Sequence, residues 1–265
     1  MRLALAQLHV EPAAVDANVE RAVDAVYEAA GEGADLVCLP ELFNVGFFAF
    51  DSYERRSESL DGETLKTVRD AAVEAGVAVL AGSIVEDLSA TAAGPAEEGL
   101  ANTSVLFDAD GERRLVYRKH HLFGYESAEA KLLTPGEDLQ TADLLGFTVG
   151  VTTCYDLRFP ELYRELVDDG VDLVLVPSAW PYPRVEHWQL LPKARAVENL
   201  AYVAAVNGSG DFADASLVGR STVYDPWGTT LASTDDDPDI VYADVDPERP
   251  ASVREEFPAL RDRRC

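Results

Sequence analysis

Three side chains that could act on a carbonyl group stand where predicted strands end. Cys154 follows the apolar run "FTVGVTT", Glu41 follows "DLVCLP", and Lys119 closes "RRLVYRK". Sites in α/β sheets form beyond the carboxyl ends of strands, so these three groups could meet on one rim. A thiolate attacks a carbonyl carbon, a carboxylate in an apolar pocket can accept the thiol proton, and an ammonium can stabilise the oxyanion. The set therefore predicts amide cleavage by acyl transfer.

Each of these residues also has a structural interpretation. A lone cysteine is more often inert packing, a glutamate after a proline is often a turn or first-turn helix residue, and a lysine at a strand end is often exposed. Cys38, inside the apolar run "DLVCLP", is predicted to be such a core residue. Cys265 is terminal and is expected to be disordered or exposed.

Hydrophobic periodicity indicates the elements that must carry the reactive groups. Leu3 and Leu5 predict a short buried strand, and "DANVERAVDAVYEAA" predicts an amphipathic helix with Asp16 as its N-cap. A buried strand over 36–39 follows and is ended by Pro40. This strand–helix–strand order favours an α/β architecture.

A second unit repeats this pattern. The stretches "GADLVCLPELF" and "GVDLVLVPSAW" share a glycine, an Asp-Leu-Val triplet and a proline at equal spacing. The second predicted strand stops at Pro177. Two similar units suggest the two halves of one sandwich, so the chain is expected to form a single domain over residues 1–265.

The remaining elements alternate in the same way. A surface loop is expected at "ATAAGPAEEGLA", a hairpin turn at 109–111 and an acidic, solvated turn at "TDDDPD", and the tail "VREEFPALRDRRC" shows no clear periodicity. Helices are predicted at "SLDGETLKTVRDAAVEAG", "PELYRELVDDG" and "LPKARAVENL", and strands at "VAVLAGSIVE", "AYVAAVN", "GRSTVYD" and "DIVYADVD".

Composition limits the partners. The chain has 48 acidic and 22 basic residues, only four of them lysines, and a formal net charge of −26. Such a surface repels nucleic acid and anionic lipid. It also repels itself unless salt screens it, so we hypothesise that the protein is halophilic, adapted to a salt-rich cytoplasm.

The cysteines and the first residues indicate a compartment. Three cysteines make no disulfide framework, and "MRLALAQLHVEP" is too short for a secretory signal. No apolar run reaches membrane-spanning length. A cytoplasmic, soluble protein is expected.

The motifs around the three reactive groups resemble those of the nitrilase, or carbon–nitrogen hydrolase, superfamily. The motifs that carry the resemblance are "LVCLPELFNVGFF", "YRKHHLFGYES", "GVTTCYDLRFPELYREL", "ARAVENLAYVAAVNGSG" and "GRSTVYDPWG". The resemblance implies a four-layer αββα sandwich without a cofactor or metal, commonly associated as homodimers or higher homo-oligomers. It also implies that Glu41 is the general base, Lys119 the oxyanion stabiliser and Cys154 the nucleophile, with a small-molecule amide as substrate.

Further residues follow from the same resemblance. Many members have a second glutamate after the lysine motif; Glu129 matches it, and Glu126 is the alternative. The backbone N–H of Tyr155 would help to hold the oxyanion. Arg158 matches an arginine that grips a substrate carboxylate in relatives acting on N-carbamoyl amino acids. It could equally pair with a local acid and hold the turn in shape.

Several alternatives stay open. Tyr155-Asp156 follows the nucleophile where true nitrilases usually have Trp-Glu, which favours amides, although N-carbamoyl hydrolases and nitrilases share the motifs. A Cys–His hydrolase would need one of the four histidines near Cys154; His121 is instead expected to support the lysine motif. No paired Cys or His spacing indicates zinc. A binding protein that keeps the fold without the chemistry is the remaining alternative.

Overall fold

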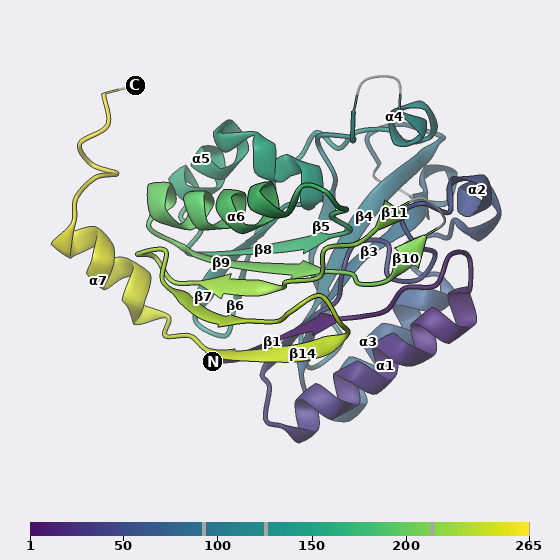
Figure 1. Ribbon diagram of the computed structural model, residues 1–265, viewed down its shortest axis with the longest axis horizontal. Helices are drawn as coiled ribbons and strands as arrows, with labels where there is room; N and C mark the ends of the chain where they lie inside the picture. Colours follow the sequence, from purple (N-terminus) through teal and green to yellow (C-terminus); the bar gives the residue numbers. More distant parts are fainter. Residues whose placement is uncertain (92–93, 125–126, 213–214, 265) are drawn as a thin grey trace.

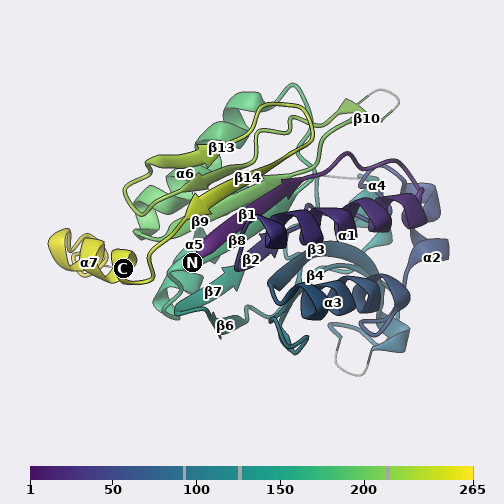
Figure 2. The same cartoon turned by 90° about the horizontal axis from the view of Figure 1, so that it is seen from below.

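Two six-stranded sheets stack face to face, and helices cover the outer side of each (Figures 1 and 2). The computed structural model describes residues 1–91, 94–124, 127–212 and 215–264. The layer order is helix, sheet, sheet, helix, so the αββα sandwich expected from the resemblance is confirmed.

Both sheets follow the same plan, with parallel strands in the centre and antiparallel strands at the edges. The first runs in the order β14 (Asp239–Asp244), β1 (Arg2–Gln7), β2 (Leu36–Cys38), β3 (Ala78–Asp87), β4 (Leu100–Phe107), β5 (Arg113–Arg118). The second runs in the order β13 (Thr230–Ser233), β12 (Thr222–Tyr224), β9 (Tyr202–Asn207), β8 (Leu173–Ser178), β7 (Phe147–Val151), β6 (Thr141–Leu144).

Helices form the outer layers. The first sheet is covered by α1 (Val15–Gly31) and α3 (Glu63–Ala75), and the second by α5 (Pro160–Asp168) and α6 (Val185–Asn199) (Figure 1). The other elements are η1 (Phe50–Ser52), α2 (Tyr53–Arg56), η2 (Leu88–Ala90), α4 (Ala128–Leu132), η3 (Cys154–Arg158), β10 (Asp211–Phe212), β11 (Ala215–Ser216) and α7 (Glu248–Glu256).

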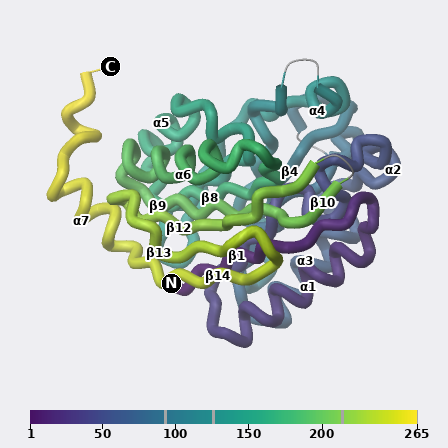
Figure 3. The backbone as a smooth tube through the Cα atoms, viewed as in Figure 1, coloured from purple at the N-terminus to yellow at the C-terminus, as the bar shows by residue number. Residues whose placement is uncertain are grey.

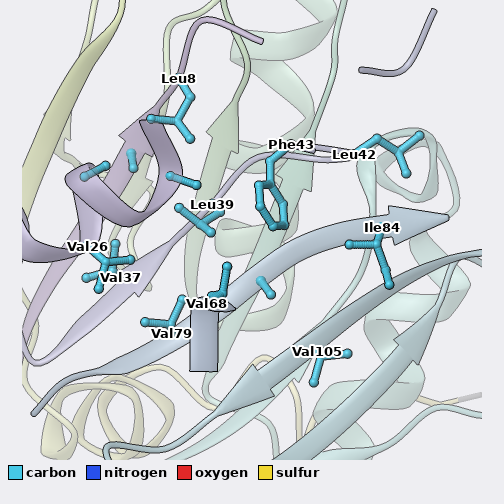
Figure 4. Close-up of a cluster of buried hydrophobic side chains, with 14 of the residues drawn as sticks. Leu8, Val26, Val37, Leu39, Leu42, Phe43, Val68, Val79, Ile84 and Val105 are labelled. Carbon is cyan, nitrogen blue, oxygen red and sulfur yellow. The ribbon is translucent and has the colours of Figure 1, made fainter. Parts of the chain in front are cut away.

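The central strands are buried on both faces, which is why they read as continuous apolar runs. Leu3 and Leu5 of β1 lie between the sheets, whereas Ala4 and Ala6 face the helices. Figure 4 shows the core on the helix side of the first sheet, where Val37 and Val79 lie near Val26 and Val68. Cys38 belongs to the core between the sheets, so its assignment as a core residue is confirmed.

The repeated sequence units occupy equivalent places in the two sheets. The Asp35 carboxylate accepts the N–H of Arg2 at 2.6 Å, and the Asp172 carboxylate accepts the N–H of Thr148 at 3.0 Å. Each aspartate thus joins a helix-to-strand turn to the strand that precedes the helix. The shared Asp-Leu-Val triplet therefore reflects one local structure used twice.

Pro177 does not end its strand, contrary to the sequence prediction. Ser178 C=O accepts from Gly208 N–H on the β9 side, whereas Leu175 C=O accepts from Thr152 N–H on the β7 side. Because alternate residues of a strand face opposite neighbours, Pro177 faces β7, beyond that strand's last residue. No ladder bond is lost there, so the proline is tolerated inside β8.

The predicted start of α1 is also corrected. The N-cap is Ala14 rather than Asp16, which lies in the first turn, where its negative charge still favours the helix. The chain before the helix is fixed by Asn18, whose side chain accepts from Glu11 N–H at 2.8 Å and donates to Glu11 C=O at 2.7 Å.

The tail contains a helix that the sequence did not indicate. Helix α7 has no strong apolar stripe, because only Pro250 and Val253 are buried. It is held instead by Arg254, which donates to the carbonyls of Leu200 at 3.1 Å and Val171 at 2.8 Å. Figure 3 shows α7 and the segment after it leading away from the sandwich, while the N-terminus lies beside β14. Among the described residues, no helix is both long and apolar enough to span a bilayer.

Candidate active site

The carboxyl ends of β2, β5 and β7 bring the predicted reactive groups together. Lys119 Nζ lies 2.8 Å from Glu41 Oε1 and 2.8 Å from Glu129 Oε1. Cys154 is 7% exposed, more than Glu41, Lys119 or Glu129. It interacts with both Glu41 and Lys119. An acid, an amine and a thiol therefore share one buried site.

Glu41 is held by a close approach between two chain segments. Strand β3 has an irregularity after Ala81, and a Cβ added at Gly82 would lie 1.9 Å from the Leu39 carbonyl oxygen. Ser83 Oγ, next in the chain, accepts the N–H of Leu42 at 2.8 Å. A glycine at position 82 is therefore needed for the turn after β2 to lie this close to β3.

The environment of Glu41 suits a base. Burial raises the pKa of its carboxyl, the ammonium of Lys119 acts in the opposite direction, and the charge of Glu129 raises the pKa further. The net pKa is higher than that of an ordinary glutamate. Its Oε2 atom accepts the N–H of Ala179 at 2.9 Å, which fixes the carboxyl from the end of β8.

Lys119 follows β5 by one residue and is completely enclosed. Burial disfavours its ammonium, but the carboxylates of Glu129 and Glu41 outweigh this effect, so the pKa of Lys119 lies above its usual value. The lysine therefore stays charged. Two backbone hydrogen bonds fix the residue: Lys119 N–H donates to Asn102 C=O at 2.9 Å, and Lys119 C=O accepts from Gly136 N–H at 2.9 Å.

Glu129 occupies the place expected for the second glutamate. It is fully buried in α4, whose N-cap Ser127 accepts the N–H of Ala130 at 3.1 Å. Glu129 Oε2 also accepts the N–H of Phe123 at 2.5 Å. The other sequence candidate, Glu126, lies outside the described residues.

Cys154 lies in a sharp turn rather than at the end of a strand. Strand β7 stops at Val151, and Cys154 begins η3 with a φ of +47°. A non-glycine residue in this left-handed region is strained and needs support from its surroundings. The turn presents the thiol at the sheet edge, as strand-to-helix nucleophile turns do.

The Cys154 thiol is kept protonated in the resting site. Burial raises its pKa well above the usual value, and Glu41 raises it further by charge and by a hydrogen bond. Lys119 and the N–H of Ala179 act in the opposite direction. Glu41 is the neighbouring group that could accept a proton from this thiol.

Asp156 supports this turn, and the sequence analysis did not assign it a role. Its buried carboxylate accepts four hydrogen bonds: Oδ2 from Thr153 N–H at 2.9 Å and Tyr117 OH at 2.6 Å, Oδ1 from the N–H of His121 at 2.9 Å and its Nδ1 at 2.8 Å. Asp156 therefore ties the nucleophile turn to the strand and loop that carry Lys119. In the sequence, the only feature that pointed to this supporting role was an acidic residue two positions after the cysteine.

Asn102 also contacts the reactive groups, and this contact was not predicted from the sequence. Its Nδ2 donates to Glu41 Oε1 at 2.8 Å and lies 3.4 Å from Glu129 Oε1, so it bridges the two carboxyl groups. Its Oδ1 is buried and, within the described part of the chain, unpaired. The available signal was a run of three polar residues, 102–104, inside the otherwise apolar strand β4.

The histidines take part in other contacts. His121 stacks on Phe159 with ring centroids 3.6 Å apart and bonds Asp156, so it connects the segment that follows Lys119 to the nucleophile turn. His187 Nδ1 accepts a hydrogen bond from Arg158. In the described ranges no hydrogen bond joins a histidine to Cys154, and no group of His, Cys, Asp or Glu side chains is arranged to hold a metal ion.

A pocket of about 200 Å³ contains Cys154 in its wall. Its aromatic members are Phe47, Phe48, Phe123, Tyr155, Trp180 and Tyr182, and its charged members are Arg158 and Arg184. Ligand sites for drug-sized molecules usually measure roughly 300–1,000 Å³, so this pocket suits a smaller substrate. A larger groove, about 590 Å³, lies over α6 and β13 and contains neither the thiol nor its partners.

Comparison with known proteins agrees with this arrangement. Residues 2–255 match the family model described as carbon-nitrogen hydrolase. The chain is 38% identical to a 2-oxoglutaramate amidase of Paenarthrobacter nicotinovorans over 237 residues, which cover 88% of this chain and 79% of the relative. It is 37% identical to the omega-amidase NIT2 of Mus musculus, covering 100% of this chain and 95% of the relative.

A solved structure resembles the whole chain. Saccharomyces cerevisiae Nit3, described as a member of branch 10 of the nitrilase superfamily, superposes with a TM-score of 0.89 at 31% sequence identity. The match covers 100% of this chain and 97% of the yeast protein. The sheet architecture is therefore shared with that protein over the whole chain.

Proposed function

Since the chain belongs to the carbon–nitrogen hydrolase family, we propose that Cys154 is its nucleophile, Glu41 its general base and Lys119 its oxyanion stabiliser. The enzyme hydrolyses the carbon–nitrogen bond of an amide. The observation that carries the residue assignment is the placement of one ammonium between two buried carboxyl groups, beside a thiol that must give up its proton.

The reaction runs in two halves. Glu41 takes the proton from Cys154 Sγ as the sulfur attacks the amide carbon, and the carbonyl oxygen becomes an oxyanion beside Lys119 and the N–H of Tyr155. The carbon–nitrogen bond then breaks, Glu41 returns the proton to the leaving nitrogen, and a thioester remains. Water attacks this thioester with Glu41 again as base, and the acid and free thiol are released.

Glu129 serves as a positioning residue in this scheme. Its carboxylate accepts from Lys119 Nζ on one oxygen and from Phe123 N–H on the other, so the ammonium keeps its place while Glu41 exchanges a proton. With two carboxylates nearby, the lysine stays charged when one of them becomes neutral.

The substrate is proposed to be the terminal amide of a short carboxylic acid. Relatives named 2-oxoglutaramate amidase and omega-amidase support this class, and the pocket volume of about 200 Å³ suits a small molecule. The aromatic walls would hold the short chain of such a substrate.

A turnover screen tests the function. Ammonia release is measured over a panel of terminal amides, N-carbamoyl amino acids and nitriles for the wild type and for Cys154→Ala, Glu41→Gln and Cys38→Ala. We expect an amide to be the best substrate, activity to be lost in the first two variants, and Cys38→Ala to retain it. A nitrile or carbamoyl compound turned over faster than every amide would reassign the substrate class.

The assembly is proposed to be a homodimer or higher homo-oligomer. Leu190 and Val197 on α6 are 62% and 47% exposed, and Leu231 on β13 is 41% exposed. Leu190 lines the larger groove, and Val197 and Leu231 lie on α6 and β13, which border it; a second copy of this chain would cover this face. In light scattering, Leu190→Asp should then shift the molar mass toward the monomer, whereas an unchanged mass would place the contact elsewhere.

We also propose that residues 1–265 form one catalytic domain that works in the cytoplasm. A nucleophilic thiol must remain reduced, and Cys38 and Cys154 are both free. A reducing compartment suits this requirement.

A further inference from the structure

A fully buried asparagine, Asn207, lies behind the reactive groups at the end of β9. It pairs in register with Ser178, the last residue of the parallel strand β8. The chain that continues from β8 carries Ala179 and Trp180, which both line the Cys154 pocket. A buried polar side chain needs partners for its polar atoms, so the partners of Asn207 indicate what it does.

The side-chain amide of Asn207 holds both backbone groups of Trp180. Its Oδ1 accepts the Trp180 N–H at 2.7 Å, and its Nδ2 donates to the Trp180 C=O at 3.3 Å. Nδ2 also donates to the Gly219 C=O at 2.9 Å. The amide thus supplies the partners that a neighbouring strand would offer, at the point where β8 and β9 stop pairing, and it fixes the direction of the segment after β8.

The segment fixed in this way presents one N–H to the reactive groups. The Ala179 N–H donates to Glu41 Oε2 at 2.9 Å and also interacts with Cys154. The Ser178 C=O belongs to the same peptide group and accepts from Gly208 N–H at 3.1 Å and from Glu41 N–H at 3.3 Å. The Ala179 N–H therefore contacts both groups that exchange the proton in the proposed mechanism.

Asn207 is held in turn by buried polar contacts that cross to the other sheet. Its N–H donates to Ser221 Oγ at 2.9 Å, and Ser221 Oγ donates to Gln7 Oε1 at 2.9 Å. Gln7 ends β1 in the first sheet, whereas Asn207 ends β9 in the second. Because a buried polar group that loses its partner is costly, these contacts leave Asn207 little freedom to move.

We propose that Asn207 is a positioning residue for the proton transfer and that it acts by fixing the Ala179 N–H against Glu41 and Cys154. This inference rests on the proposed function and deepens it. An ionised Glu41 carries negative charge on its carboxylate, and the sulfur gains negative charge as its proton leaves. An oriented N–H donor stabilises whichever of the two groups is charged. Asn207 therefore acts through the backbone of the segment after β8.

The consequence is a change in pH dependence when the amide is removed. Asn207→Leu has a side chain of similar size without polar atoms, so the Trp180 backbone loses its partners and the Ala179 N–H loses its direction. Glu41 should then ionise at higher pH, because a hydrogen bond to the charged form favours that form. Other titratable groups that face Glu41 are Lys119, Glu129, Cys154 and Tyr53. They should keep their places, since the Asn207 side chain bonds Trp180 and Gly219 instead.

The test measures kcat/KM for a terminal amide as a function of pH in the wild type and in Asn207→Leu. We expect the pH at which kcat/KM rises to move up by roughly one unit, and kcat to fall roughly tenfold or more with little change in KM. Alkylation of Cys154 by iodoacetamide over the same pH range should slow in parallel, because the same proton must leave. This second readout does not depend on amide turnover.

Asn199→Leu is the matched control. Asn199 is also a buried asparagine, but its Nδ2 donates to the Arg195 C=O at 2.9 Å within α6. Whatever its effect on the melting temperature, this variant should leave the pH profile in place. The comparison separates positioning of the Ala179 N–H from a general change in stability.

A milder variant gives the answer if Asn207→Leu does not fold. Ser221→Ala removes the hydroxyl that accepts the Asn207 N–H, so it should move the pH profile in the same direction by a smaller amount. A profile that stays fixed or moves to lower pH in Asn207→Leu, or in Ser221→Ala where Asn207→Leu does not fold, would overturn the role of Asn207. The proposed function would fail differently, because the wild type would then release no ammonia from any amide.

Discussion

At the scale of single residues, the proton between Cys154 and Glu41 is the centre of the chemistry. Burial raises the pKa of both groups, so the resting site holds a thiol beside a carboxyl group rather than a thiolate. Lys119 keeps its charge because two carboxylates face it. In the proposed mechanism, the ammonium is therefore in place for the oxyanion before substrate enters, and the thiol is activated only as it attacks.

The raised pKa of Glu41 predicts how activity depends on pH. Only the unprotonated carboxylate can accept the thiol proton, so kcat/KM should rise with pH through a value above about 4.3, the ordinary glutamate pKa. Glu129→Gln removes a charge that raises the pKa of Glu41. The rise of kcat/KM with pH, the acidic limb of the profile, should therefore move to lower pH in this variant. Its kcat should fall roughly tenfold or more, because Lys119 loses a charged partner.

The pH–rate profile is the measurement, and Glu112→Gln is the control. Glu112 is exposed near the turn between β4 and β5, so its removal should leave the acidic limb in place. An acidic limb that stays fixed in Glu129→Gln, or moves to higher pH, would remove Glu41 as the titrating base.

At the scale of elements, the sequence was sufficient to predict the two strand–helix–strand units, because both use the same local structure. The Asp-Leu-Val strands were predictable because they are apolar runs buried on both faces, and the helices before them because each buries one face. Three features could not be predicted from the sequence: the continuation of β8 through Pro177, helix α7 and the positive φ of Cys154. Each depends on which neighbouring strand a residue faces or on which distant group holds it. Glu41, Lys119 and Cys154 were predicted from their motifs and their positions after strands, and their roles stay predictions. Asn102 and Asp156 were not predicted, because their contacts join segments far apart in the chain.

Gly82 tests how the elements position Glu41. Gly82→Ala would place a Cβ 1.9 Å from the Leu39 carbonyl oxygen, so β3 and the turn after β2 must separate. We expect a loss of about 1–3 kcal/mol in the free energy of unfolding and a fall in kcat, because Glu41 moves with this turn.

Gly31→Ala is the matched control, since a Cβ there meets no atom within 4 Å. It should leave kcat unchanged and should not destabilise the protein. Denaturant unfolding and steady-state kinetics of both variants measure these effects. Wild-type stability and kcat in Gly82→Ala would show that the close approach of β3 is not needed.

At the scale of the whole molecule, the net charge of −26 dominates the surface. In the buried reactive site two carboxyl groups face the ammonium of Lys119, whereas the acidic exterior repels itself. Salt adaptation is the proposal that accounts for this composition, because screening lowers the repulsion without changing any buried contact.

The melting temperature should therefore rise steeply from about 0.01 M to about 1 M KCl, as the screening length falls from roughly 30 Å to roughly 3 Å. Thermal unfolding across this range is the measurement, and a neutral osmolyte at matched osmolality is the control. A melting temperature that does not change with KCl would reject salt adaptation.

The most direct test of the account is whether an amide substrate leaves its acyl group on Cys154. Rapid acid quenching of a reacting mixture, followed by peptide mass spectrometry, should find the acyl mass on the peptide that contains Cys154 and not on the one that contains Cys38. The adduct should be absent from Cys154→Ala, and it should decay as the acid product forms. Turnover of the amide without any acylated Cys154 peptide, or with the acyl mass on another residue, would contradict the mechanism.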